Sequence, residues 1–249
     1  MADAPALKLD GVSMRFGGLV AVNAVSLSLA QGQRCAVIGP NGAGKTTLFR
    51  TVAGEAYPTS GRIELFSKDV TRMAPNRRAH RGIGRTYQVT DVFLDLTVEE
   101  NVAIAAQALT RSRFTLWRPL RISGELGQRV DRALEQVELA DRRDRIAHEL
   151  SHGEQRQLEL ALALAGDPKV LLLDEPAAGL SASERVLMRR LIEGLPTDLT
   201  MVLIEHDMSL ALDLVEHVLV MDNGETIAQG VPDAIRGNEQ VQAVYLKSD

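Results

Sequence analysis

The stretch GPNGAGKT at residues 39–46 decides the fold of this 249-residue chain. It follows the apolar run Arg34 to Ile38, a predicted buried strand, and it precedes a predicted helix that ends at Gly54. This pattern predicts a phosphate-binding loop, because its glycines let successive backbone N–H groups face one anion at the helix N-terminus. Lys45 would supply positive charge for the β and γ phosphates, and the Thr46 hydroxyl would bind Mg²⁺. We therefore expect an α/β protein that binds a nucleotide.

An acidic pair ends a second predicted strand, in the stretch VLLLDE at residues 170–175. The carboxyl ends of parallel strands meet at one edge of a sheet, so Asp174 and Glu175 are expected near the phosphate-binding loop. Asp174 would hold Mg²⁺, directly or through water, and Glu175 would polarise the water that attacks the γ-phosphate. By themselves the two motifs could describe a kinase, a GTPase or a recombinase.

Composition places the chain among ordinary globular proteins. Apolar residues make up 45% and charged residues 24%, and scarce aromatics leave Leu, Val, Ile and Ala to build the core. The net charge of -5 argues against a nucleic-acid partner. The single cysteine, Cys35, excludes a disulfide framework and is expected in the core. No apolar stretch reaches 18 residues and no secretory leader is visible, so a soluble intracellular protein is predicted.

Local patterns predict further strands and helices. Alternation from Leu7 to about Leu29 indicates two half-buried strands joined at Gly17-Gly18. The capping boxes TVEE at 97–100 and SASE at 181–184 each begin a helix. The other expected elements are strands at Arg62–Phe66, Met201–Ile204, Val218–Met221 and Thr226–Gln229, and helices at Asp131–Leu139, at Glu154–Ala165 and from Pro232. The basic cluster Arg77 to Arg81 is expected to be a solvated surface.

The stretch LSHGEQ at residues 150–155 precedes a predicted helix. Ser151 and the backbone of Gly153 form an anion site there, although in isolation this pattern is an ordinary N-cap. Together with the other motifs of the chain, this stretch points to one protein family. The chain resembles the nucleotide-binding subunit of an ABC transporter in the order of Lys45, Gln88, Ser151, Asp174-Glu175 and His206. The resemblance covers nearly the whole chain, from Phe16 to Tyr245.

The resemblance implies a role for several residues. Phe16 would stack on adenine, Gln88 would bridge Mg²⁺ and the membrane subunit, and His206 would contact the γ-phosphate. The signature around Ser151 would cap the γ-phosphate held by a second subunit. Without the resemblance, Phe16 is equally a core aromatic, Gln88 a loop residue and His206 a helix cap.

The expected site is therefore the following set. The catalytic residues are Lys45, Gln88, Glu175 and His206. The nucleotide-binding residues are Phe16, Gly39, Pro40, Asn41, Gly42, Ala43, Gly44, Lys45, Thr46, Thr47, Ser151, Gly153 and Glu154. The Mg²⁺ ligands are Thr46, Gln88 and Asp174. Two positions depart from the family pattern, which usually has glycine at His152 and often aspartate at Ser181. Neither departure touches Lys45, Asp174 or Glu175, so ATP hydrolysis is expected to survive.

Four stretches point to one branch of the family: RTYQ at 85–88, DEPAAGL at 174–180, LIEHDM at 203–208 and VYL at 244–246. They resemble the ATPases of branched-chain amino-acid uptake systems. That branch implies a second ATPase subunit (the same or a related chain), transmembrane permease subunits and, indirectly, an external solute-binding protein. It also implies a peripheral location on the cytoplasmic face of the inner membrane. The alternatives are the ATPase of lipopolysaccharide export, a non-transport ABC ATPase, and an ATP-binding regulatory module, against which Glu175 argues.

The fold class that follows is an ABC-type α/β core with an antiparallel β subdomain and a helical subdomain. A single ABC ATPase domain is expected over residues 1–249. Residues 1–90 and 166–249 would form the core, and about 91–165 would form the helical subdomain with the signature. Within that subdomain, Thr110 to Gly124 is expected to be a link, and its Phe114 and Trp117 are candidates for docking on the membrane subunits or for local packing.

Overall fold

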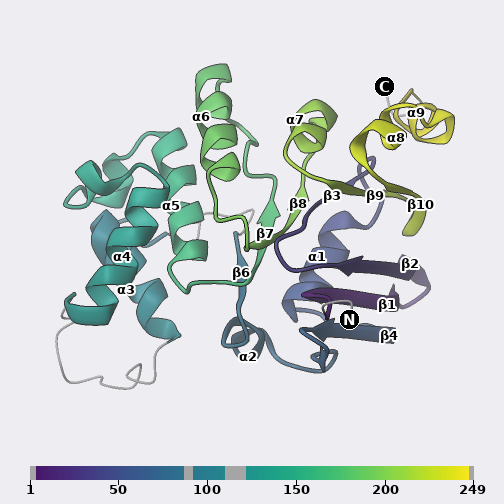
Figure 1. Cartoon of the computed structure of the whole chain (residues 1–249), viewed down its shortest axis with the longest axis horizontal. Coiled ribbons are helices and arrows are strands. Elements are labelled where there is room, and N and C mark those ends of the chain that lie inside the picture. The colour runs from purple at the N-terminus through teal and green to yellow at the C-terminus, as the bar shows by residue number, and fades with distance from the viewer. Residues whose placement is uncertain (1–3, 87–91, 110–121, 247–249) are drawn as a thin grey trace. The chain divides into compact units, whose positions relative to one another are not determined.

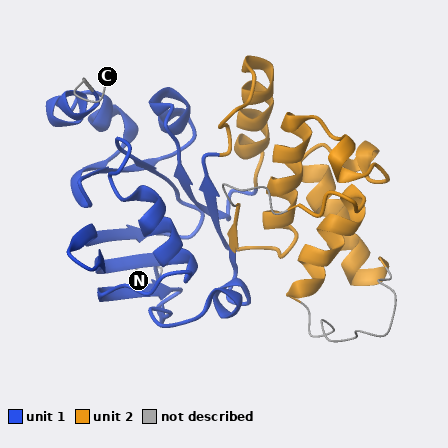
Figure 2. Ribbon diagram, turned by 180° about the vertical axis from the view of Figure 1, so that it is seen from behind, with its two compact units in different colours: residues 1–83, 169–175, 196–249 blue, residues 84–168, 176–195 orange. Residues whose placement is uncertain are grey.

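The computed structural model describes residues 4–86, 92–109 and 122–246 (Figure 1). The chain divides into two compact units, which Figure 2 colours separately. Unit 1 holds residues 1–83, 169–175 and 196–249, and unit 2 holds residues 84–168 and 176–195. Both sheets belong mainly to unit 1, whereas unit 2 is built of helices.

The first sheet of unit 1 is antiparallel and has the order β2-β1-β4-β5. Its strands are β1 (Leu7–Phe16), β2 (Leu19–Leu29), β4 (Ser60–Leu65) and β5 (Lys68–Asp69). Leu7 pairs with Leu29 on one side and with Leu65 on the other. Their side chains are buried, as the alternating pattern predicts. The predicted antiparallel subdomain is therefore confirmed.

The second sheet carries the nucleotide motifs and has the order β10-β9-β3-β8-β7-β6. Its strands are β3 (Arg34–Ile38), β6 (Ile83–Arg85), β7 (Val170–Asp174), β8 (Thr200–Ile204), β9 (His217–Asp222) and β10 (Glu225–Gly230). Strands β9, β3, β8 and β7 run parallel, and β10 is antiparallel to β9. Every residue of β7 and β8 is buried, in keeping with their nearly unbroken apolar runs.

The helices of unit 1 are α1 (Lys45–Ala53), α2 (Pro75–Ala79), α7 (Met208–Asp213), α8 (Pro232–Arg236) and α9 (Glu239–Leu246). The predicted helix after the phosphate-binding loop is α1, and it ends at Gly54 in the left-handed conformation. The core of this unit packs Phe49 of α1 with Leu9 of the first sheet and with Val37 and Leu172 of the second, and Cys35 is among its buried residues. Burial raises the pKa of the Cys35 thiol, as expected for a core cysteine.

Arg78 corrects the prediction that residues 77–81 form a solvated surface. Its side chain has 0% exposure. Burial lowers its pKa to about 10, although the charge of Asp69 opposes this shift. A Cβ at Gly54 would lie 2.8 Å from Nε of Arg78, so the glycine leaves room for the guanidinium. That group donates hydrogen bonds to the carbonyls of Thr51 (2.8 Å), Val52 (2.6 Å), Thr71 (3.0 Å) and Met73 (3.0 Å).

Unit 2 contains the helices α3 (Val98–Ala108), α4 (Gly124–Gln136), α5 (His152–Leu164) and α6 (Ala182–Glu193). It also contains the short 3-10 helices η1 (Ala140–Arg142) and η2 (Ala147–Glu149). The predicted capping boxes at Thr97 and Ser181 begin α3 and α6. The α3, α4 and α5 helices pack on one another, and Gln157 of α5 donates a buried hydrogen bond of 2.7 Å to the Val137 carbonyl.

The predicted helix at Asp131–Leu139 was wrong in its bounds. The observed α4 begins at Gly124, where the Glu125–Arg129 pair at 2.8 Å supports its first turn. It ends at Gln136 because Glu138 adopts a left-handed φ of 57°. The predictions for Phe114 and Trp117 lie outside the described residues.

Candidate nucleotide-binding site

The loop at residues 39–46 leads from β3 into α1 and turns through several glycines with positive φ. At Gly39 the φ is 149°, and a Cβ there would lie 2.0 Å from the Met221 carbonyl oxygen. At Gly44 the φ is 96°, and a Cβ would lie 2.2 Å from the Ala21 carbonyl oxygen. Only glycine fits these two positions, so neighbouring strands hold the path of the loop.

A hairpin tip supports this loop from the side. The turn between β9 and β10 places Asn223 and Gly224 at φ values of 46° and 83°. The Gly224 N–H donates to the Ala43 carbonyl at 3.1 Å, and the Gly224 carbonyl accepts from the N–H of Asn23 at 2.8 Å. The sequence shows this Asn-Gly pair as a turn, but no pattern in it shows that the turn contacts the phosphate-binding loop.

Lys45 lies at the base of the loop with 5% exposure. Its Nζ donates to the carbonyls of Gly39 at 2.7 Å and Pro40 at 2.9 Å. Burial lowers the pKa of Lys45, and the carboxylates of Glu175 and Asp174 oppose that shift. A desolvated ammonium group at a helix N-terminus is well suited to attract a phosphate anion.

The acidic pair lies at the end of β7, as predicted. Asp174 is buried, and its negative charge raises the pKa of Lys45. Glu175 adopts a left-handed φ of 51°, and its N–H donates to the Ile204 carbonyl at 3.0 Å. Its Oε1 lies 2.6 Å from Nε2 of His206. The backbone at Glu175 is therefore strained. Its carboxylate, just after β7, contacts the imidazole of His206, just after β8.

His206 is not a helix cap, because Asp207 caps α7 by accepting from the Leu210 N–H at 3.1 Å. The imidazole of His206 is 48% exposed. Phe16 is not a core aromatic either, because it ends β1 with 51% exposure. Both side chains are therefore accessible to a ligand, and the roles assigned to them stay predictions.

The remaining residues of unit 1 lie where the motif predicts. Thr46 and Thr47 belong to the first turn of α1, Ala43 is buried, and Asn41 and Gly42 are exposed in the loop. Thr46 and Asp174 offer a hydroxyl and a carboxylate, which are hard oxygen donors of the kind that Mg²⁺ prefers. Gln88 lies outside the described residues.

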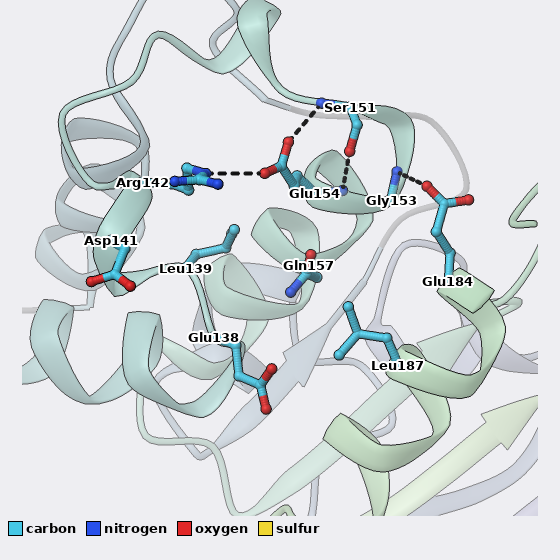
Figure 3. Close-up of a pocket in the computed structure, with 10 residues that line it drawn as sticks. All are labelled: Glu138, Leu139, Asp141, Arg142, Ser151, Gly153, Glu154, Gln157, Glu184 and Leu187. Carbon is cyan, nitrogen blue, oxygen red and sulfur yellow. Dashed lines mark hydrogen bonds and ion pairs between the residues drawn. The ribbon is translucent and has the colours of Figure 1, made fainter.

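The signature residues lie in unit 2, at the N-terminus of α5. Ser151 is the N-cap and accepts from the Glu154 N–H at 3.2 Å, while Glu154 accepts from the Ser151 N–H at 2.9 Å. The second bond is the main reason why the pKa of Glu154 is lowered. The Gly153 N–H donates to Oε1 of Glu184 on α6 at 3.1 Å (Figure 3). The sequence predicted the cap of α6 but not this contact with α5.

A cavity of about 380 Å³ opens beside this helix end. Carboxylates dominate the charged part of its lining, in which Arg142 pairs with Glu154 at 3.3 Å. Its lining residues are Glu138, Leu139, Asp141, Arg142, Ser151, Gly153, Glu154, Gln157, Glu184 and Leu187 (Figure 3).

Comparison with known proteins identifies the family. The ABC transporter family model matches residues 22–178, which include the phosphate-binding loop, the signature and the acidic pair. The chain belongs to the ABC transporter family. This ABC ATPase is 37% identical to BraF of Pseudomonas aeruginosa, a high-affinity branched-chain amino acid transport ATP-binding protein, over 97% of this chain and 98% of the relative. It is 38% identical to the corresponding protein LivG of Escherichia coli K12, with the same coverage.

Solved structures agree with this family assignment. A nucleotide-free ATP-binding cassette from an ABC transporter matches with a TM-score of 0.86 and 29% identity, over 97% of this chain and 98% of the other. The ADP conformation of an ABC transporter cassette matches with a TM-score of 0.86 and 28% identity, with the same coverage. The predicted fold class, ATPase activity and nucleotide cofactor are therefore confirmed.

Proposed function

We propose that this ABC ATPase powers an importer of branched-chain amino acids or a related small solute. The supporting observation is likeness over nearly the whole chain to ATP-binding proteins of branched-chain amino-acid transport. A protein of Archaeoglobus fulgidus described as a probable member of the same group is 34% identical over 96% of this chain. No observation favours lipopolysaccharide export or a role outside transport.

Hydrolysis would take place at the edge of the parallel sheet, where Lys45, Asp174, Glu175 and His206 belong to one compact unit. The loop N–H groups and Lys45 would hold the phosphates and offset the charge that develops on them. Thr46 and Asp174, with Gln88, would hold Mg²⁺, which supplies further positive charge to the β and γ phosphates.

Glu175 would act as general base. Its carboxylate would take a proton from water while the water oxygen bonds to the γ-phosphorus and the bond to the β–γ bridging oxygen breaks, giving ADP and phosphate. His206, 2.6 Å from Glu175, would hold that carboxylate in place and contact the γ-phosphate. The left-handed backbone of Glu175 directs the side chain for this task.

The signature at Ser151 and Gly153 would serve nucleotide bound to a second ATPase subunit, either another copy or a related chain. Transmembrane permease subunits would carry the solute, and an external solute-binding protein would deliver it. No helix among the described residues combines the length and the apolar character that crossing a bilayer requires. From the likeness to ATP-binding proteins of transporters, we propose a peripheral subunit that docks on its permeases from the cytoplasmic side.

Purification from native membranes tests this proposal. A tagged copy of the chain should bring down hydrophobic permease subunits, and deleting its gene should abolish uptake of labelled leucine, isoleucine and valine. A copy with Lys45→Ala should still bring down the permeases but should not restore uptake. Unchanged uptake of these and related small solutes in the deletion strain would contradict the proposed importer.

A further inference from the structure

The carboxylate of Glu184 links the beginnings of two helices in unit 2. Oε2 accepts hydrogen bonds from Ser181 through its N–H at 2.9 Å and its hydroxyl at 2.6 Å. Oε1 accepts the N–H of Gly153 at 3.1 Å, so the same side chain that caps α6 also reaches the first turn of α5 (Figure 3). A capping box alone requires only the bonds to Ser181.

The space around Gly153 fits this contact closely. A Cβ on Gly153 would lie 2.4 Å from Oε1 of Glu184, so the carboxylate occupies the room that the missing side chain leaves. The hydrogen bonds from Ser181, followed by the one from Gly153, lower the pKa of Glu184. A full negative charge therefore lies at the N-terminus of the signature helix at neutral pH.

Phosphate and Glu184 would compete for the same donor. A backbone N–H makes one strong hydrogen bond, and the N–H of Gly153 already makes one to Glu184. An approaching γ-phosphate would also be repelled by the carboxylate across a short distance. The two anions therefore oppose each other at this helix end.

Building on the proposed role of the signature, we propose that Glu184 is a positioning residue that occupies the Gly153 N–H in the free chain. It must release this N–H when the partner subunit presents its bound nucleotide. Glu184 thus weakens ATP-driven association, and the free chain keeps its signature closed to anions until a partner arrives.

Glu184→Gln separates this role from simple helix capping. Glutamine at the same position still forms a capping box with Ser181, but it carries no charge. Glu193→Gln is the matched control, because Glu193 lies near the other end of α6 and pairs with Arg189 at 2.8 Å. Both changes remove one carboxylate from the same helix, and only one of them lies at the signature.

The experiment measures the dissociation constant of the ATP-bound dimer by sedimentation, in a Glu175→Gln background that slows hydrolysis. The chain is used alone and mixed with the related ATPase subunit of its transporter. Adding Glu184→Gln should tighten the dimer about three- to tenfold, the size of a charge effect at a helix N-terminus acting at two sites. High salt should shrink this difference, and Glu193→Gln should leave the constant unchanged.

The outcomes separate the two levels of the proposal. If Glu175→Gln associates with ATP but Glu184→Gln leaves that dimer unchanged or weakens it, Glu184 is only a cap and the inference is wrong. If Glu175→Gln fails to associate with itself and with the related subunit, the proposed role of the signature fails, and the inference fails with it.

Discussion

The two helix ends assigned to phosphate are built in opposite ways. The N-cap of α1 is Gly44, which has no side chain to cap the helix, and the first turn of α1 holds no acidic residue. The α5 helix begins at Ser151 inside a full capping box, with Glu154 in its first turn and Glu184 on the Gly153 N–H. The bare end is left for a nucleotide to complete, whereas the chain itself fills the capped end.

This difference requires support for α1 from elsewhere. Uncapped N–H groups at its N-terminus leave that end dependent on the loop, which the hairpin at Gly224 holds in place. At the opposite end, Arg78 donates to the carbonyls of Thr51 and Val52 and places a cation where the helix dipole is negative. At the N-terminus of α5, the capping box satisfies the N–H of Glu154, and Glu184 of α6 accepts the N–H of Gly153.

The largest effect is expected from Lys45→Ala at the bare end. The change removes a buried charge and a phosphate contact together, so ATP affinity should fall at least about a hundredfold. Calorimetric titration measures this directly. Arg50→Ala is the control, because Arg50 lies on the same helix but has an exposed side chain that pairs with Glu55. Micromolar ATP binding by Lys45→Ala would contradict the claim that the uncapped N-terminus of α1, unlike that of α5, is built to bind the nucleotide.

A change at the other end of α1 should lower stability. Arg78→Met would leave four carbonyls without this donor, those of Thr51 and Val52 in buried hydrogen bonds, so the free energy of unfolding should fall by about 2–5 kcal/mol. Lysine cannot reach the same four groups, so Arg78→Lys should recover little. Denaturant unfolding measures both variants, and a loss within 0.5 kcal/mol, about that of a surface change, would show that Arg78 is not needed there.

The capped end should respond differently. Ser151→Ala should slow ATP turnover of the assembled transporter about ten- to hundredfold, because a donor to the γ-phosphate is lost. ATP affinity of the isolated chain should not change. Thr97→Ala is matched to it, since it removes the same kind of cap from α3. That variant should lose about 1 kcal/mol of stability and keep its turnover. Weaker ATP binding by the isolated Ser151→Ala chain would contradict the division of labour.

The smallest effect concerns acid. Hydrogen bonds lower the pKa of Glu154 below its usual 4.5, mainly through the Ser151 N–H. Its stabilising effect is therefore complete above that value and is lost as the pH falls through the lower pKa of the folded state. Glu154→Gln should flatten the decline of unfolding free energy in this acid range. An unchanged pH dependence would show that the Glu154 carboxylate in the cap of α5 makes no measurable contribution to the free energy of unfolding.

The helices and strands that the sequence predicts correctly are those determined by residues close together in the chain. The apolar run of β7, the capping boxes at Thr97 and Ser181, and the left-handed stop at Gly54 each depend on neighbouring residues. The prediction that Arg78 is solvated was wrong because its hydrogen-bond partners are backbone carbonyls, and no pattern of side chains in the sequence reveals such partners. A short run of basic residues predicts an exposed surface, but the α2 helix directs one of these residues, Arg78, into the core.

The site divides in the same way. The loop at residues 39–46 and the pair Asp174-Glu175 carry residue types and spacing that predict phosphate binding and water activation directly from the sequence. The roles of Phe16, His206 and Ser151 came from resemblance alone, because an exposed aromatic, a histidine after a strand and an N-cap serine are common. The contact of Glu184 with Gly153 joins segments far apart in the chain, and no local pattern predicts it.

Single-turnover hydrolysis by Glu175→Gln, measured beside its ATP affinity, tests the central claim most directly. The change keeps the size of the side chain and removes its ability to accept a proton, so hydrolysis should slow about 10²- to 10⁴-fold. Affinity should change little, because Lys45 and the loop remain. Asp174→Asn should differ by weakening Mg²⁺-dependent binding as well. If Glu175→Gln turned over ATP within a few-fold of the unchanged protein, Glu175 would be only a carboxylate at a strand end and the proposed site would be wrong.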